Sequence, residues 1–198
     1  MTWLEKAANL FAEIGDRAGE LQSTGLLGVA FLWQGDYDRA ETYLDKVSSG
    51  FDELGSRNPR GPVLLGQIAW FKGNFAKVHI FFKEALQIAS SMDDEYTIAD
   101  VFRNLAFMAK IANDDGRAAR LFGAFKSLVE ANPELAVIMR AQAKKRPSSF
   151  ETKLNTSIDE MFSNYQTKWE KEWSAGRAMT LDQAIAYVME SRFTGNEQ

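Results

Sequence analysis

The chain has 198 residues, of which 45% are hydrophobic and 25% are charged, and its formal net charge is −4. A chain of this length and composition buries a core as one domain or as one continuous repeat array, so extended disorder is excluded, and its mild acidity makes nucleic acid and acidic membranes poor partners. Cysteine is absent, which excludes disulfides, thiolate metal sites and a cysteine nucleophile and is typical of the reducing cytoplasm.

Apolar residues recur every three to four positions along nearly the whole chain, a spacing that predicts helices. No apolar run is long enough to span a bilayer, and residues 1–8 lack the pattern of a signal peptide, so we expect a cytoplasmic protein. Prolines fall where this periodicity lapses. The helices expected in chain order, with a broken stretch over 132–149, cover residues 2–14, 20–34, 37–53, 62–72, 75–91, 95–112, 116–131, 150–175 and 181–192.

An internal repeat organises residues 20–131. Its first copy consists of small, aromatic and aliphatic positions, namely Gly28, Gly35, Tyr37, Ala40, Leu44 and Val47. The same kinds of residue recur, all at one constant interval, as Gly66, Gly73, Phe75, Val78, Phe82 and Ala85. A weaker third copy follows at a slightly longer interval as Ala106, Asn113, Asp115, Ala118, Phe122 and Phe125. Such a period predicts a stack of similar units.

Each repeat is expected to be an antiparallel helix pair. Gly35 provides a turn with positive φ, and the small Gly28 is expected to face the small Ala40 so that the two backbones approach. Tyr37, like Phe75 in the next copy, is expected to seat the second helix on the first. Each pair leaves an apolar face that the following pair buries, which is why such units occur in arrays.

The Gly-Asp-Tyr-Asp-x-Ala turn of residues 35–40 resembles the tetratricopeptide repeat. The period here is longer than the roughly 34 residues of that family, and the usual tryptophan of the first helix is replaced by Thr24, Pro62 or Phe102. The resemblance implies an all-α, right-handed superhelical array over residues 1–131, beginning with an incomplete repeat. Residues 132–198 are then expected to form a connector and C-terminal capping helices.

Two further strings, residues 116–124 and 173–185, are similar to the C-terminal end of the repeat region in large bacterial signal-transduction proteins. In those proteins the repeats follow a regulatory ATPase and a DNA-binding or cyclase domain. The resemblance implies that the chain is part of a longer regulator. Within the tail, we expect Gly176 to end one helix, and Thr180 and Gln183 to form a capping box for the last one.

Motifs that carry chemistry are missing from the sequence. Neither phosphate-binding glycine loop is present, and His79 has no second imidazole or cysteine with which to hold a metal. The acidic runs at 93–95 and 114–115 are expected to start helices, and the basic run over 140–146 is expected to be a solvated connector. We therefore expect no catalytic site, no metal site and no cofactor.

The resemblance places eight residues near the concave face of the array. They are Val29, Trp33, Gln67, Trp70, Phe71, Arg103, Phe107 and Lys110. Aromatic anchors beside a few polar groups suit a groove for a peptide or a small effector. The alternative is that Trp70 and Phe107 fill the core between neighbouring repeats.

These observations predict a non-catalytic module that binds a protein, a peptide or a small-molecule effector, as the sensory part of a bacterial transcriptional regulator or signalling protein. The alternative is a free-standing scaffold that assembles other proteins or pairs with itself as a homodimer through Leu4, Leu10 and Phe11 of the first helix. An enzyme is the third and last candidate.

Overall fold

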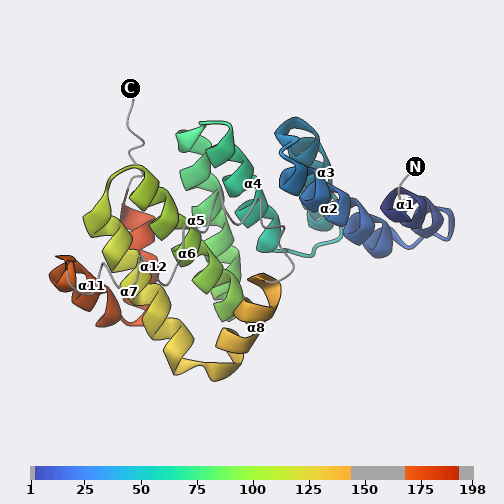
Figure 1. The fold of residues 1–198 in the computed structure, drawn as a ribbon. Helices are drawn as coiled ribbons and strands as arrows, with labels where there is room; N and C mark the ends of the chain where they lie inside the picture. Colours follow the sequence, from blue (N-terminus) through green and yellow to red (C-terminus); the bar gives the residue numbers. More distant parts are fainter. Residues whose placement is uncertain (1–2, 144–167, 192–198) are drawn as a thin grey trace. The chain divides into compact units, whose positions relative to one another are not determined.

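A computed structural model of the chain describes residues 3–143 and 168–191. All regular structure in these residues is helical (Figure 1). The helices are α1 (Trp3–Glu13), α2 (Arg17–Gln34), α3 (Tyr37–Glu53), α4 (Arg60–Phe71), α5 (Phe75–Ser91), α6 (Glu95–Ile111), α7 (Asp115–Ala131), α8 (Pro133–Ala143), α11 (Glu170–Arg177) and α12 (Leu181–Glu190).

The chain forms two compact units, residues 1–88 and 89–198, which divide within α5. The boundary that the sequence predicts at residue 131 falls inside the second unit, at the end of α7. Of the helix expected over residues 150–175, only the part from Lys168 onward lies among the described residues. Within the part of the chain that the structure describes, no helix is both long and apolar enough to cross a membrane.

One turn design joins most of the consecutive helices. At the α2–α3 turn, Gly35 has φ +82°, and the amide of Asp36 donates to the carbonyl of Phe31 at 3.0 Å. Asp36 then caps α3, because its side chain accepts a hydrogen bond from the amide of Arg39. The same two-residue turn occurs at Gly15–Asp16, Gly35–Asp36, Gly73–Asn74, Asp93–Asp94 and Asn113–Asp114. The acidic runs therefore start helices, as predicted.

Glycines on the first helices accommodate bulky side chains of the second helices. A Cβ added at Gly28 of α2 would lie 2.8 Å from Leu44 Cγ of α3, and one at Gly66 of α4 would lie 3.0 Å from the Phe82 ring of α5. The two contacts have the same spacing, so the sequence repeat is also a repeat of packing. Gly28 thus faces Leu44, whereas Ala40 was expected there, because a missing Cβ makes room for a large neighbour.

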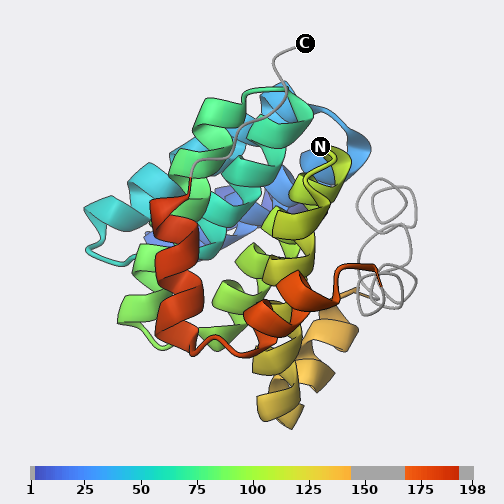
Figure 2. The ribbon, with the colours of Figure 1, turned by 90° about the vertical axis from the view of Figure 1, so that its left-hand side faces the viewer.

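In the second unit, α7 lies at the centre and packs against α6, α8, α11 and α12 (Figure 2). The first of these, α6, is buried on all sides from Thr97 to Ala109. The helix α8 lies in the stretch that was expected to be broken. That expectation was wrong because Pro133 starts the helix, where a missing amide hydrogen costs nothing, and Asn132 caps it by accepting from the Leu135 amide at 3.1 Å.

The crossing of α7 and α11 depends on two facing glycines. A Cβ added at Gly123 would lie 3.0 Å from the backbone nitrogen of Arg177, and one at Gly176 would overlap the carbonyl oxygen of Arg120. The expectation that Gly176 ends its helix is wrong, since α11 continues through it to Arg177. The capping box of Thr180 and Gln183 at the start of α12 is confirmed.

Candidate functional site

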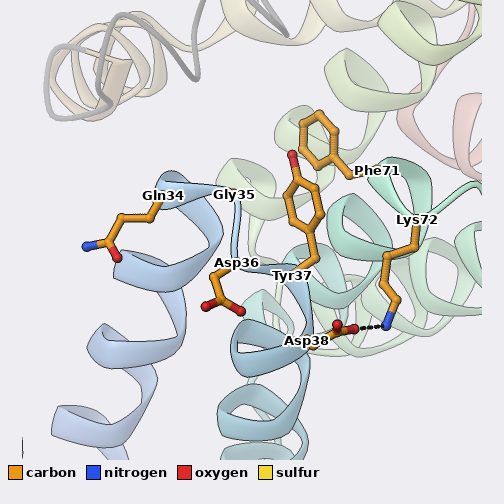
Figure 3. A pocket seen from close by; sticks show the side chains of 7 residues that line it. All are labelled: Gln34, Gly35, Asp36, Tyr37, Asp38, Phe71 and Lys72. Carbon is orange, nitrogen blue, oxygen red and sulfur yellow. Dashed lines mark hydrogen bonds and ion pairs between the residues drawn. The ribbon is translucent and has the colours of Figure 1, made fainter.

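An open hollow of about 590 Å³ lies in the first unit, where the α2–α3 turn meets the C-terminal end of α4 (Figure 3). We call it the Tyr37 hollow. Its lining combines two aromatic rings with carboxylates, an amide and an ammonium group, contributed by Gln34, Gly35, Asp36, Tyr37, Asp38, Phe71 and Lys72. The turn geometry described above therefore positions most of the lining.

A stacked aromatic pair forms the apolar part of the hollow. The rings of Tyr37 and Phe71 lie parallel within 5°, with their centroids 5.0 Å apart, and both side chains are half-buried. The pair joins the start of α3 to the end of α4. Tyr37 therefore contacts the first helix of the following repeat, whereas Phe75 packs edge-on against Trp70 of its own repeat, with the centroids 5.2 Å apart.

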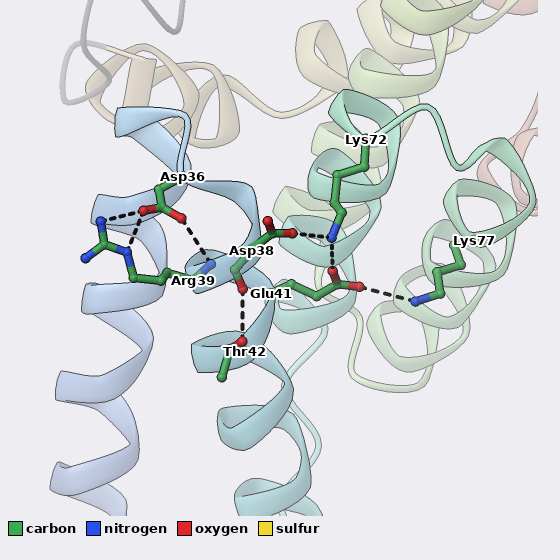
Figure 4. Close-up of polar contacts among 7 residues, drawn as sticks. All are labelled: Asp36, Asp38, Arg39, Glu41, Thr42, Lys72 and Lys77. Carbon is green, nitrogen blue, oxygen red and sulfur yellow. Dashed lines mark hydrogen bonds and ion pairs between the residues drawn. The ribbon is translucent and has the colours of Figure 1, made fainter.

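A network of ion pairs borders the hollow on the side of α3 (Figure 4). Lys72 Nζ lies 2.7 Å from Asp38 Oδ1 and 2.7 Å from Glu41 Oε2, and Lys77 Nζ lies 3.2 Å from Glu41 Oε1. The hydrogen bond with Asp38 is the largest cause that raises the pKa of Lys72, and the hydrogen bond with Glu41 is the second. The network links α3 to the end of α4 and the start of α5.

The surroundings shift the pKa values of Glu41 and Asp45, two of the acidic side chains of α3, in opposite directions. The hydrogen bond from Lys72 is the main cause that lowers the pKa of Glu41. Burial raises the pKa of Asp45, and the negative charge of Glu41 raises it further. Glu41 therefore stays ionised to a lower pH than an ordinary glutamate, and its protonation in acid should weaken the network.

On the other side of the hollow, Asp36 is paired with Arg39, which lowers the pKa of Asp36. The Arg39 guanidinium also lies 4.3 Å from the centroid of the Phe31 ring, which stacks on Tyr43 at 5.3 Å. Both carboxylates of the lining thus have cationic neighbours. A lining of rings and oriented charges suits the recognition of an apolar side chain next to a polar group.

We expect Glu41→Gln to lower the free energy of unfolding by about 0.5–1 kcal/mol at pH 7, because the ion pair is partly exposed. The folded state lowers the pKa of Glu41 from its ordinary 4.5, so the pair stabilises the fold above that pH, and its contribution is lost as the pH falls through the lowered pKa. Urea unfolding at neutral and acidic pH measures this change.

The variant should therefore lose less stability than the wild type between pH 7 and about pH 3. Glu84→Gln, which removes the charge of an exposed glutamate of α5 that is not part of this network, serves as the control variant. An identical acid loss in the Glu41→Gln variant would contradict the expected linkage.

The predicted groove residues lie in different environments. In the first unit, Phe71 lines the hollow, Val29, Trp33 and Trp70 are half-buried, and Gln67 is only 2% exposed. Of these five residues, Phe71 alone belongs to the lining of the hollow. The groove that the resemblance implies for them remains a prediction.

In the second unit, the three predicted residues all lie on α6. Phe107 is 5% exposed, and Arg103 is buried and paired with Asp100. Lys110 is more exposed and lies 2.7 Å from Asp115 at the start of α7. Burial at Phe107 favours the core interpretation for this residue, because a ring with so little exposed area offers little surface to a ligand.

Sequence reasoning did not assign a binding role to Tyr37, Asp38 or Lys72. The signal that could have found them is the repeat itself, because Gln34-Gly35 and Lys72-Gly73 occupy equivalent turns of successive repeats. Stacked repeats bring equivalent positions close together, so such turns are candidates for a shared site. The residues predicted to bind lie instead on the first helices of the repeats, α2, α4 and α6.

The other residues considered for chemistry are not among those that line the hollow. His79 is half-buried on α5, and Arg140 is exposed on α8. The remaining basic residues of the run, at 144–146, lie outside the described residues. Among the residues that are described, no three histidine, aspartate or glutamate side chains converge as a metal site would require. Comparison with models of protein families, with curated protein sequences and with solved structures found no match.

Proposed function

We propose that the chain is a non-catalytic module of helical repeats, arranged as in the tetratricopeptide family, that binds a peptide or an exposed protein segment at the Tyr37 hollow. The observation that supports this proposal best is the stacked pair of Tyr37 and Phe71, which offers apolar ring surface at an open hollow. Paired aromatic rings of this kind are typical anchors of protein recognition.

The surroundings of the rings favour a peptide over a small effector. Sites for small molecules enclose most of their ligand, whereas this hollow is open to solvent. A peptide can place one apolar side chain on the rings while its polar groups approach Asp38 and Lys72 at the rim. A role within a bacterial transcriptional or signalling regulator, which the sequence resemblance implies, is the setting that we propose for this binding.

The test uses an array of random 12-residue peptides as the probe. We expect the wild type to select a set of peptides rich in aromatic or aliphatic residues, and Tyr37→Ala to weaken binding to that set by about tenfold or more, which corresponds to one lost anchor. Tyr37→Phe keeps the ring and should retain most of the binding. Circular dichroism checks that each variant keeps its helicity.

Ile80→Ala is the matched control, because Ile80 is an exposed apolar residue of the same unit, 61% exposed, and does not line the hollow. It should bind the selected peptides as the wild type does. Binding that survives in the Tyr37→Ala variant, or a wild type that selects no peptide, would refute the proposed site.

A further inference from the structure

The first helix has an apolar face that the rest of its unit leaves uncovered. Trp3 is 83% exposed, Leu10 is 60% exposed and Ile14 is 74% exposed. With Ala7 they follow each other at intervals of four, three and four residues, so they form one line along α1 that ends on Ile14, the first residue after the helix, and we call this line the α1 stripe. One flank of the stripe is covered by α2, since a Cβ added at Gly19 of α2 would lie 2.5 Å from the ring of Phe11.

The internal repeat shows what such a face does. Gly15 and Gly55 are both turn residues with positive φ that follow a helix, and the interval between them maps α1 onto α3. The residues equivalent to Trp3, Ala7 and Leu10 are then Tyr43, Val47 and Gly50. All three contact α2, through Phe31, Gly25 and Leu21 respectively. The stripe is therefore the face with which this type of helix packs on a neighbouring helix.

We propose that the α1 stripe binds the α1 stripe of a second copy of the chain, with the two helices antiparallel about a two-fold axis. Shape favours this occupant. Leu10 stands where α3 has Gly50, whose missing Cβ lets Leu21 of α2 approach, so a helix like α2 would collide with Leu10. In an antiparallel pair, Leu10 of each copy faces the small Ala7 of the other, and Trp3 faces Ile14.

Charge also favours the antiparallel pair. Lys6 and Glu13 are about two helical turns apart, so they lie on the same flank of the stripe. Lys6 already lies next to the stripe, with its Nζ 4.8 Å from the centroid of the Trp3 ring. Antiparallel pairing brings Lys6 of each copy close to Glu13 of the other. A parallel pair would instead place the two charged flanks on opposite sides of the stripe, so that Lys6 and Glu13 of the two copies would not meet.

The size of the stripe sets the expected strength. Four side chains from each copy make an interface below the standard size, so we expect a reversible dimer with a Kd of roughly 10–100 μM. Sedimentation velocity from about 5 μM to about 500 μM should show a shift from monomer to dimer over this range.

Variants identify the interface. Leu10→Glu should leave the protein monomeric at every concentration tested, because two carboxylates would face the apolar stripe. Ile80→Glu is the matched control, since Ile80 is a 61% exposed apolar residue on α5 of the same unit and is not part of the stripe, and this variant should dimerise like the wild type. Circular dichroism of both variants verifies that the helices are retained.

Charge exchange tests the orientation. Lys6→Glu and Glu13→Lys should each weaken the dimer several-fold, and the double variant should recover the wild-type Kd because the pairs are restored in reverse. A wild type that stays monomeric at about 500 μM, a dimer that survives Leu10→Glu, or a double variant that is not rescued would overturn the proposal. Peptide binding at the Tyr37 hollow should be the same in all these variants, so the two proposals fail independently.

Discussion

Gly176→Ala should lower the free energy of unfolding by about 3 kcal/mol or more and release α11 from α7. A Cβ at this position would overlap the carbonyl oxygen of Arg120, and two further backbone atoms of Arg120 lie within 3.0 Å of it. Backbone atoms in the middle of a packed helix do not move aside as a flexible side chain can. The two helices would therefore have to separate.

Two measurements check this result. Urea unfolding gives the loss of stability, and hydrogen exchange of the amides of α11 reports whether that helix still docks on α7. Trp173, which is only 5% exposed in α11, should also become more exposed to solvent and to fluorescence quenchers.

Gly116→Ala provides the matched control for this prediction. Gly116 lies in α7 and near the same partner helix, yet a Cβ there would lie 3.7 Å from Glu172 Cγ, which is ordinary contact. This substitution should be neutral or stabilise the helix by up to about 1 kcal/mol, since alanine has less freedom than glycine in the unfolded chain. Equal stability of the two variants would contradict the proposed backbone contact.

Phe82→Ala should cost about 3–5 kcal/mol, the range for removing a fully buried phenylalanine. Phe82 is 1% exposed, and its ring covers Gly66, so removing the ring leaves a cavity lined partly by the backbone of α4. The surrounding helices cannot close this cavity without changing the packing of α4 on α5. Urea unfolding with a fitted m-value measures the loss.

Phe81, the residue before Phe82 in α5, provides the control for this prediction. Phe81→Ala removes the same atoms from the adjacent position of α5, where the side chain is half-buried. Folding removes less apolar surface from water at the half-buried Phe81 than at the fully buried Phe82. Phe81→Ala should therefore lower the free energy of unfolding clearly less than Phe82→Ala. If both variants lost the same free energy of unfolding, the contact of the Phe82 ring with Gly66 would not be what stabilises this repeat.

Much of the local structure was predictable from the sequence. The bounds of α3 and α5 are the predicted ones, Tyr37–Glu53 and Phe75–Ser91. Their starts and the turns before them depend on hydrogen bonds between residues that are close in the chain, as at Gly35 and Asp36. The sequence pattern around Pro133 indicates a break and so does not predict α8, although proline is well tolerated in the first turn of a helix.

The candidate site was less predictable. Of the residues that line it, only Phe71 was assigned to binding in advance, and the stack of Tyr37 on Phe71 joins two different repeats. Which rings meet across a repeat boundary depends on the angle and register at which α3 packs on α4. The periodicity of one helix contains no information on either quantity.

The sequence by itself determined the helical class, the repeat, the turns with positive φ and the helix caps, because neighbouring residues decide these through backbone conformation and short-range hydrogen bonds. Only the tertiary structure decided that Gly176 serves a helix crossing, that Leu44 covers Gly28, and that an apolar stripe on α1 is left open. These features depend on the distance between elements far apart in the chain, which is a property of the packed unit and not of any single segment.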